Sequence, residues 1–231
     1  MNEIIRKRKS IRKYDMTPLD SPTLEKARAR LSDVRPLYAG IRFSIDTASK
    51  TKGIFGVKAP HYFIFRSEMK DGAFENIGFV GQQMDLFFSK SGLGSCWLGM
   101  AKPENEPGGA LPFVISMAFG RPAEPLYRDL SGFKRKPLSE ISEGSDERLE
   151  AARLAPSAMN AQNWYFIADS GAIHCYLKKG NPLLGFMSDR LGRIDMGIAI
   201  CHIMEERGGK VRFSKEQGAP ARKELVYVGT V

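Results

Sequence analysis

The sequence of 231 residues predicts an α+β protein built from two related halves. Several segments carry apolar residues at the three- and four-residue spacing of helices, and others are short runs rich in aromatic and β-branched residues, as in strands. These segments follow one another in nearly the same order twice along the chain. With 42% apolar residues, the chain can form a substantial core, as one large domain or two small ones.

Two helices and three strands are predicted in the first half. Ser21 and Pro22 fit the N-cap and first position of a helix that continues through Leu24 and Leu31. Apolar residues at helical spacing predict the second helix, and Gly92 fits the position after its end. The predicted ranges are 74–91 for this helix and Ile41–Thr47, His61–Arg66 and Phe113–Phe119 for the strands.

A charged connection, Arg121 to Gly144, precedes the second half. The elements predicted there are a helix near Asp146–Ala155 that Pro156 stops, a strand at Trp164–Ala168, a helix near Asp195–Arg207 and a strand at Leu225–Val228.

Local matches support an internal duplication. Residues 24–28 match 149–153, residues 61–64 match 164–167, and the spacing of Gly81 and Gly92 equals that of Gly197 and Gly208. We expect a unit of roughly 110 residues, with halves at 1–137 and 138–231, although amphipathic elements alone can produce some such matches.

Composition excludes several classes of protein. No run of about 18 apolar residues is present, and residues 1–14 are basic and polar rather than a signal peptide, so we expect a cytoplasmic protein. The three cysteines and three histidines lack the spacing of metal ligands, which favours buried thiols and core or edge histidines. A net charge of +9 indicates an anionic partner: nucleic acid, an acidic membrane surface or a phosphorylated small molecule.

The segment Arg6–Tyr14 concentrates positive charge, with six basic side chains in nine residues. If Ile11 and Tyr14 pack inward, Arg8, Ser10 and Arg12 all point outward and can bind a phosphate through guanidinium groups and a hydroxyl. A solvated basic arm or a nucleic-acid contact is equally compatible with this segment alone.

Two loop-like segments suit a planar ligand. In 155–164, asparagine and glutamine can pair with the edge of a heterocycle, and small residues let the backbone approach. In 92–100, glycines bracket an apolar stretch whose backbone N–H groups can face a ligand. Each segment by itself is also compatible with an ordinary turn or helix cap.

Taken together, these segments resemble the FMN-dependent nitroreductase family. The pattern R-x-S-x-R-x-[FY] lies at Arg8–Tyr14, P-S-x-x-N-x-Q-x-W at Pro156–Trp164, and a G-L-G-S-C-W-type segment at Gly92–Gly99. The resemblance extends to Gly120–Pro122 and Arg135–Leu138, and it implies a mostly antiparallel sheet flanked by helices. The asparagine-bearing segment usually lies in the first third of such chains, so this sequence looks like a divergent, internally duplicated branch.

Family members are generally intertwined homodimers with the flavin at the interface. The resemblance therefore implies that the two halves form a pseudo-dimer with one composite FMN site. The reciprocal site is degenerate, because residues 29–38 lack the asparagine motif and residues 208–213 replace the glycine-rich run. We expect one FMN per chain and no metal.

The resemblance also implies the residues that hold the flavin. Arg8, Ser10, Arg135 and Lys136 would bind the phosphate, Arg12 would lie near N1 and C2=O, the Gly99 N–H would face N5, and Leu98 would pack on the ring. The turn that completes the site contains Pro156, Ser157, Ala158 and Asn160.

The implied reaction is ping-pong. NAD(P)H reduces FMN and leaves, and an electron-poor acceptor such as a nitroaromatic or quinone then enters the same pocket, without a covalent protein intermediate. The alternatives are a flavin-binding protein without enzymatic activity and a protein that binds nucleic acid through its basic arm. The motifs of nucleic-acid-binding folds are missing from the sequence, and we expect neither a nucleic-acid nor a membrane partner.

Overall fold

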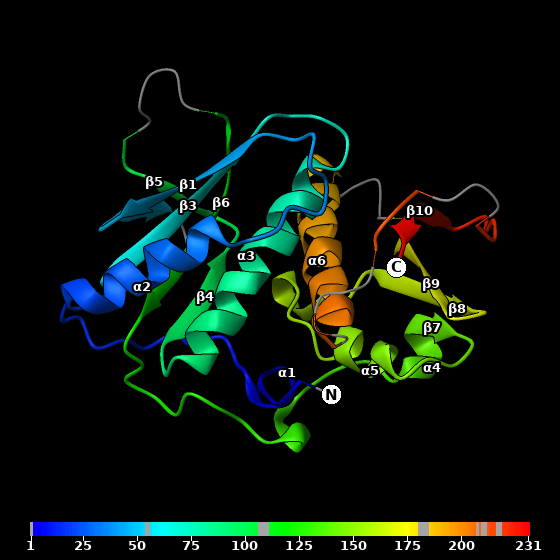
Figure 1. Ribbon diagram of the computed structural model, residues 1–231, viewed down its shortest axis with the longest axis horizontal. Helices are drawn as coiled ribbons and strands as arrows, with labels where there is room; N and C mark the ends of the chain where they lie inside the picture. Colours follow the sequence, from blue (N-terminus) through cyan, green and yellow to red (C-terminus); the bar gives the residue numbers. More distant parts are fainter. Residues whose placement is uncertain are drawn as a thin grey trace.

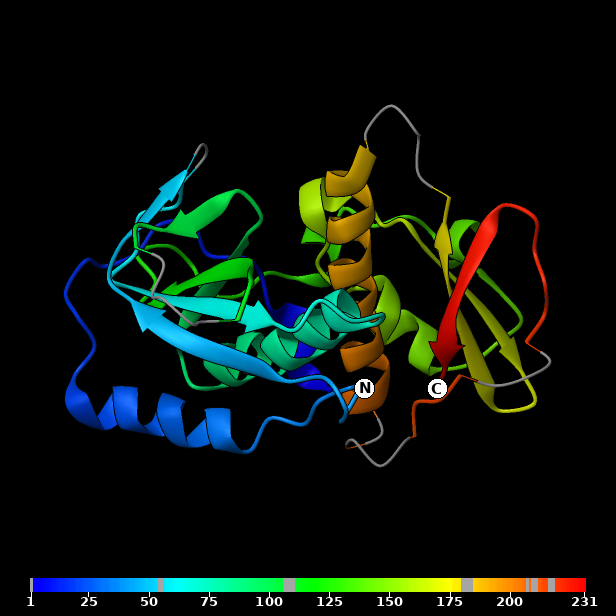
Figure 2. The same ribbon diagram turned by 90° about the horizontal axis from the view of Figure 1, so that it is seen from above.

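The computed structural model describes residues 2–53, 56–105, 111–179, 185–206, 208, 212–215 and 219–231. Two four-stranded sheets lie on either side of a pair of long helices, α3 (Ala73–Lys90) and α6 (Gly185–Glu206) (Figures 1 and 2). This arrangement confirms the predicted α+β class. Among the residues in these ranges, no helix is long and apolar enough to span a bilayer.

The first sheet is antiparallel, with the order β1-β3-β6-β4. Its strands are β1 (Phe43–Ala48), β3 (His61–Ser67), β6 (Phe113–Gly120) and β4 (Gly94–Leu98). The first three confirm the predicted strands. The fourth corrects the interpretation of 92–100 as a loop, because Gly94 to Leu98 pair with β6 at the edge of the sheet. Gly94 serves close packing, since a Cβ there would lie 2.6 Å from Ile11 Cγ1.

Three further elements flank this sheet. Strands β2 (Thr51–Gly53) and β5 (Ala101–Pro103) pair with each other, and helix α2 (Ser21–Ser32) runs along one side of the sheet (Figure 2). The N-cap of α2 is Asp20 rather than the predicted Ser21, because the Asp20 carboxylate accepts the Thr23 N–H at 2.9 Å. Helix α2 packs loosely, and only Ala27 of its residues is buried.

The second sheet has the order β10-β9-β8-β7, with β7 parallel to β8 and the other pairs antiparallel. Its strands are β7 (Ser142–Glu143), β8 (Trp164–Asp169), β9 (Ala172–Lys178) and β10 (Leu225–Thr230). Strand β9 was not predicted. A two-residue turn with positive φ at both Ser170 (50°) and Gly171 (83°) joins it to β8, and Ser-Gly is a turn signal that the strand pattern alone does not use.

Helix α6 is longer than predicted, and the remaining helices are short. It already includes Gly185, ten residues before the predicted start at Asp195, while the predicted last residue, Arg207, lies outside the described ranges. The arginines at 190 and 193 interrupt the apolar pattern that predicts a helix. In the structure, Arg193 Nη1 pairs with Glu75 Oε1 of α3 at 2.9 Å. The short helices are α1 (Glu3–Lys7), η1 (Leu130–Gly132), α4 (Leu138–Ile141), α5 (Arg148–Arg153, shorter than the predicted 146–155) and η2 (Ala158–Asn160).

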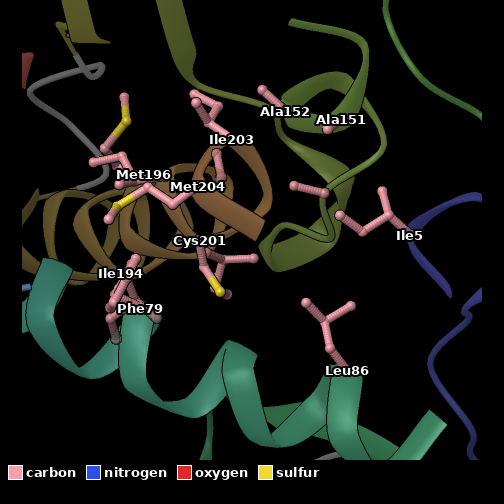
Figure 3. Close-up of a cluster of buried hydrophobic side chains, with 14 of the residues drawn as sticks. Ile5, Phe79, Leu86, Ala151, Ala152, Ile194, Met196, Cys201, Ile203 and Met204 are labelled. Atoms are coloured by element: carbon pink, nitrogen blue, oxygen red, sulfur yellow. The ribbon is translucent and has the colours of Figure 1, made fainter. Parts of the chain in front are cut away.

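One hydrophobic core spans both halves of the chain. Figure 3 shows Phe79 and Leu86 of α3 facing Ile194 and Cys201 of α6, with α5 and Ile5 of α1 beside them. All residues of α3 except 74, 87 and 90 are buried, so this helix is covered on every side.

Helices α3 and α6 cross through two glycines that play reciprocal parts. A Cβ on Gly78 would lie 2.0 Å from the Ile194 carbonyl oxygen, and a Cβ on Gly197 would lie 1.9 Å from the Glu75 carbonyl oxygen. Each glycine therefore makes room for a backbone carbonyl of the other helix. That carbonyl belongs to the residue three positions before the other glycine. Gly81, which the sequence comparison paired with Gly197, instead packs against the Trp97 side chain.

The two sheets share an antiparallel three-strand arrangement. In the first, β3 precedes the long helix and lies between β1 and β6; in the second, β9 precedes the long helix and lies between β8 and β10. Strand β3 therefore occupies the same place in its sheet as β9 does in the second, whereas the matched residues 164–167 lie in β8. Of the other matched segments, residues 24–28 lie in helix α2 and residues 149–153 in helix α5.

The cysteines and histidines occupy the structural positions that their spacing favoured. Cys96, Cys175 and Cys201 are buried and unpaired. His174 Nδ1 lies 2.8 Å from the Thr230 hydroxyl, and His202 is fully buried in a hydrogen-bond network.

Candidate functional site

The N-terminal arm begins as helix α1 and continues as an extended segment against β4. Ile11 and Tyr14 are buried, as predicted, and the Ile11 N–H donates to the Ser95 carbonyl at 3.0 Å. Arg8 does not point outward with Ser10 and Arg12: its side chain is fully buried. Arg8 is the C-cap of α1, so the alternation of an extended strand does not extend back to it.

Arg8 pairs with Asp85 of α3 inside the protein. Nε lies 2.7 Å from Asp85 Oδ2, and both side chains are completely buried. Asp85 also accepts the Ser95 hydroxyl at 2.7 Å and the Gln82 amide at 2.7 Å. The carboxylate thus has several donors, which a buried charge needs.

The network continues from Gln82 into the second half of the chain. Trp97 Nε1 donates to Gln82 Oε1 at 3.2 Å, which fixes the amide orientation, so Gln82 Nε2 donates to His202 Nε2 at 3.0 Å. His202 Nδ1 then donates to the Ala151 carbonyl at 2.9 Å. Burial, together with the charge of Arg8, lowers the pKa of His202 to about 3, so this imidazole is neutral.

Arg8 belongs to a group of three arginines from separate segments, here called the arginine cluster: Arg8, Arg128 and Arg135. Arg128 Nε donates to the Arg8 carbonyl at 3.2 Å, and the Arg128 guanidinium lies 3.9 Å from the centre of the Phe133 ring. Burial, and then the charges of Arg8 and Arg12, lower the pKa of Arg128 to about 10. Burial, and then Arg128 and Arg8, lower the pKa of Arg135 to about 10.

The cluster has unused capacity to bind an anion. Arg8 Nη1 is buried and finds no hydrogen-bond partner among the described residues. Asp85 is the acidic side chain that favours the charged form of Arg128, while Arg8 and Arg12 oppose it. Because burial and neighbouring cations lower the pKa values of Arg128 and Arg135, a negatively charged ligand would stabilise the charged forms of these two side chains.

Arg135 links the cluster to the turn at 155–162. Its Nη1 donates to Asn160 Oδ1 at 2.6 Å, and its Nε donates to the Ala155 carbonyl at 3.0 Å. The Asn160 amide donates to the Lys134 carbonyl at 2.7 Å, and Lys136 Nζ donates to the Ala161 carbonyl at 2.9 Å. These bonds bring residues 134–136 and 160–161 together, as the resemblance implied.

The same turn holds an unusual backbone conformation. Met159, Asn160 and Gln162 have φ values of 50°, 57° and 51°, a region that residues other than glycine seldom occupy. Such conformations persist where surrounding contacts fix them, and they cluster at ligand sites. Here Ser157 Oγ accepts the Gln162 N–H at 3.1 Å, while the Met159 side chain is 99% exposed.

Helix α6 connects the turn to Gly99. The Ala158 N–H donates to both carboxylate oxygens of Asp195, at 3.0 and 3.1 Å. One turn earlier in α6, the Leu191 side chain lies over Gly99, where an added Cβ would come within 3.2 Å of it. Arg190 Nη2 reaches the Gly99 carbonyl at 3.4 Å, and Arg190 Nε is buried without a partner among the described residues.

Comparison with known proteins decides the family. The family model described as "Putative TM nitroreductase" matches residues 1–206. The chain belongs to this nitroreductase family. A solved structure of a "putative nitroreductase" from Thermotoga maritima superimposes with a TM-score of 0.64 at 21% identity, covering 99% of this chain and 90% of that chain. The nitroreductase fold is thereby established.

Other solved structures share parts of this fold. A nitroreductase family protein from Clostridium difficile 630 matches with a TM-score of 0.50 and 21% identity, over 64% of this chain and 99% of that chain. An FMN-dependent nitroreductase from Clostridium difficile R20291 matches with a TM-score of 0.45 and 19% identity, over 59% of this chain and 98% of that chain. No curated protein matches the chain.

Nine of the predicted site residues fall into two connected groups. The first group surrounds the arginine cluster, to which Arg8 and Arg135 belong. Ser10 contacts Arg8, Asn160 contacts Arg135, and Lys136 contacts the neighbouring turn at Ala161. Gly99 and Ala158 contact the same face of α6, while Ser157 and the buried Pro156 support the turn.

The remaining two predicted residues differ in exposure. Arg12 is exposed, and its backbone N–H donates to Glu124 at 2.7 Å. Leu98 is 6% exposed and packs in a small core with Ile11 and Tyr62, so little of its side chain is available to a ligand.

Four residues of the site were not predicted from the sequence: Asp85, Arg128, Arg190 and Asp195. Asp85 and Gln82 are polar residues one turn apart in an otherwise apolar helix, which is a signal that the search for motifs did not use. Arg128 lies in a charged connection and could be identified only after the chain had folded. Of the degenerate run at 208–213, residues 209–211 lie outside the described ranges.

Proposed function

We propose that this protein is an FMN-dependent NAD(P)H oxidoreductase that reduces small electron-poor acceptors. The observation that supports this proposal best is the arginine cluster: Arg128 and Arg135 of the connection between the halves lie close to Arg8 of the N-terminal arm, and a buried nitrogen of Arg8 lacks a partner among the described residues. A phosphate monoester carries the charge and the acceptor oxygens that such a cluster requires.

The residues that would hold the flavin come from both halves of the chain. Arg8, Arg128, Arg135 and Lys136 would bind the phosphate, with Ser10 at its edge, and Arg12 would lie near the ring. Asn160 is fixed by Arg135 and by Lys134, so its position is set before any ligand arrives. Gly99 would offer its N–H to the ring, and Ala158 and Ser157 would let the backbone approach it.

We further propose that the chain is an internal pseudo-dimer with one flavin site. Two pairs of contacts support this proposal. Gly78 and Gly197 make reciprocal contacts across the long helices. Asn76 precedes Gly78 by two residues and accepts the Leu37 N–H at 2.8 Å after α2, just as Asp195 precedes Gly197 by two residues and accepts the Ala158 N–H after α5.

Protein side chains pack closely at the position that we assign to the second, degenerate flavin site of the pseudo-dimer. A Cβ on Gly72 would lie 2.6 Å from the Tyr38 ring, and Tyr38 meets Phe213 edge to face at 5.4 Å. Aromatic packing there supports a single cofactor in each chain.

When bound, FMN supplies two-electron hydride transfer between NAD(P)H and an acceptor such as a nitroaromatic or quinone, each taken in turn by the same pocket. The protein residues supply position and charge. The arginine cluster would neutralise the phosphate, the turn at 155–162 would hold the pyrimidine edge, and Arg12 would place positive charge near the ring. We assign no covalent step to a side chain.

The first test is the visible spectrum of the purified protein, with the released chromophore identified and counted. We expect flavin bands, about one FMN per chain, and bleaching on anaerobic addition of NAD(P)H. Flavin bands without bleaching would instead indicate a flavin-binding protein without this activity. A colourless protein that FMN cannot reconstitute would contradict the proposal.

A second test separates phosphate binding from general folding. Arg128→Gln should weaken FMN binding by about 10- to 100-fold, the loss of a charge-assisted hydrogen bond, and should change riboflavin binding by less than about threefold. Arg121→Gln is the matched control, because Arg121 does not belong to the cluster and instead pairs with Asp20, with Nη2 2.7 Å from Asp20 Oδ2. Equal losses for FMN and riboflavin would remove the phosphate assignment.

A third test addresses the composite site. Arg12→Ala and Asn160→Ala should each weaken FMN binding, although the two residues lie in different halves of the chain. Unchanged FMN affinity in both variants would remove the shared-site proposal.

A further inference from the structure

Arg190 of α6 lies at the end of the proposed flavin site where the substrates would react. Its Nη2 contacts the Gly99 carbonyl oxygen at 3.4 Å, which is long for an N–H···O hydrogen bond. Gly99 is the residue whose N–H we expect to face N5 of the flavin. The next residue of α6, Leu191, packs over the same glycine. The Arg190 side chain is therefore close to the place that both substrates would occupy in turn.

The protein leaves the guanidinium group of Arg190 largely unsatisfied. Its Nε is buried and has no hydrogen-bond partner among the described residues. No carboxylate in the described part of the chain pairs with Arg190, and burial lowers the pKa of this side chain. A positive charge that is partly removed from water without a counter-ion costs free energy, and an anionic ligand would offset that cost.

Arg193, three residues later in α6, shows the opposite arrangement. Its Nε lies 3.0 Å from Asp189 Oδ2, and its Nη1 lies 2.9 Å from Glu75 Oε1. Burial opposes the charged form, but these two pairs raise the pKa of Arg193. Asp189 directly precedes Arg190 in the sequence and nevertheless pairs with Arg193. Both carboxylates are thus already paired, and Arg190 is available to an anion from outside the protein.

The position of Arg190 indicates which substrate carries that anion. The nicotinamide ring of the reductant bears a neutral carboxamide, and its phosphates are separated from the ring by a ribose. An acceptor ring in the same place would bring its own substituent to the side chain that contacts Gly99, and a carboxylate matches the paired N–H groups of a guanidinium. Met100, which follows Gly99 and is 45% exposed, offers accessible apolar surface to such a ring.

We propose that Arg190 binds an anionic substituent of the electron acceptor, so that the preferred acceptors are small nitroaromatic or quinone carboxylates. This inference rests on the proposed function, because it requires the flavin ring beside Gly99. Arg190 would select and orient the acceptor by its charge, and we assign it no proton or electron transfer.

The test compares 4-nitrobenzoate with 4-nitrobenzamide, which have similar shapes and differ by one negative charge. Binding to the oxidised, FMN-loaded protein is measured by equilibrium dialysis without NAD(P)H, so no turnover is needed. Wild type should bind 4-nitrobenzoate about tenfold or more tightly than 4-nitrobenzamide, and Arg190→Gln should reduce that ratio to less than about threefold. Arg190→Lys keeps the charge without the paired N–H groups and should retain part of the preference.

Arg28→Gln is the matched control, because Arg28 is an exposed arginine of α2 that lies beside strands β1 and β3 rather than beside Gly99. Its ratio of the two affinities should stay within about twofold of wild type.

The outcomes separate this inference from the proposed function. Flavin that NAD(P)H bleaches, together with the same ratio in wild type and Arg190→Gln, would overturn the inference and leave the proposed function standing. An Arg190→Gln variant with an unchanged ratio but slower bleaching by NADPH or NADH would place Arg190 on the reductant, which also overturns the inference. A protein that cannot bind FMN would contradict the proposed function, and the inference with it.

Discussion

The Arg8–Asp85 pair joins the buried core to the proposed phosphate site. Both side chains are fully buried, and Asp85 is held by Ser95 and Gln82 as well. Such a pair is costly to break from one side, because the remaining charge stays buried.

Asp85→Asn should therefore lower the free energy of unfolding by about 3–5 kcal/mol, measured by urea denaturation. Asp71→Asn is the control, since Asp71 pairs with Lys215 on the surface, where their side chains are 76% and 52% exposed. The control should change stability by less than about 0.5–1 kcal/mol. A loss of similar size in both variants would show that Arg8 is not held as described.

His202 predicts a pH dependence of stability. Its folded pKa of about 3 lies below the unfolded value near 6.5, so the unfolded chain binds the proton first as pH falls. The stabilisation is complete above about pH 6.5 and is lost progressively down to about pH 3, by at most about 1.4 kcal/mol per pH unit. Urea unfolding of wild type and His202→Gln should give stability curves that converge as pH falls through this window; parallel curves would contradict it.

At the scale of elements, the crossing of α3 and α6 depends on two glycines. Alanine normally stabilises a helix relative to glycine, but Gly78→Ala and Gly197→Ala would each place a Cβ about 2 Å from a carbonyl oxygen. Each should destabilise the protein by more than about 1 kcal/mol. Gly192→Ala in α6 is the control: its Cβ would meet only Leu177 Cδ2 at 3.9 Å, so it should stabilise the protein by about 0.5–1 kcal/mol. Thermal unfolding of the three variants measures the contrast.

The elements also show what the sequence can predict. Runs such as Phe113–Phe119 and the periodic helix at 74–91 were placed nearly to the residue, because burial on one or both faces leaves a clear apolar pattern. Strand β9 was missed because His174, Tyr176 and Lys178 break that pattern. The start of α6 was missed because the pairing of Arg193 with Glu75 of α3 is a tertiary contact that the local sequence does not reveal. The motif residues were visible as a list, but the convergence of Arg8, Arg128 and Arg135 depends on chain segments that only folding brings together.

At the scale of the whole molecule, the shared core predicts cooperative unfolding. The hydrophobic cluster includes Ile5 and Phe79 from the first half with Ile194 and Phe166 from the second, so neither half has a complete core alone. Calorimetry should show a single transition with equal calorimetric and van't Hoff enthalpies. The separate fragments 1–137 and 138–231 should each lack cooperative unfolding. Two resolved transitions would indicate independently stable halves.

Helix α3, buried on nearly all sides, has a consequence for synthesis on the ribosome. Its partner α6 is described from Gly185, about 95 residues after α3 ends at Lys90. At a translation rate of about 5–20 residues per second, the apolar face of α3 waits roughly 5–20 s for the helix that covers it. During that interval the nascent chain exposes Phe79 and Met84, which are ready sites for a chaperone. Because the proposed flavin site also needs Asn160, the proposed cofactor could be loaded only after most of the chain has been made.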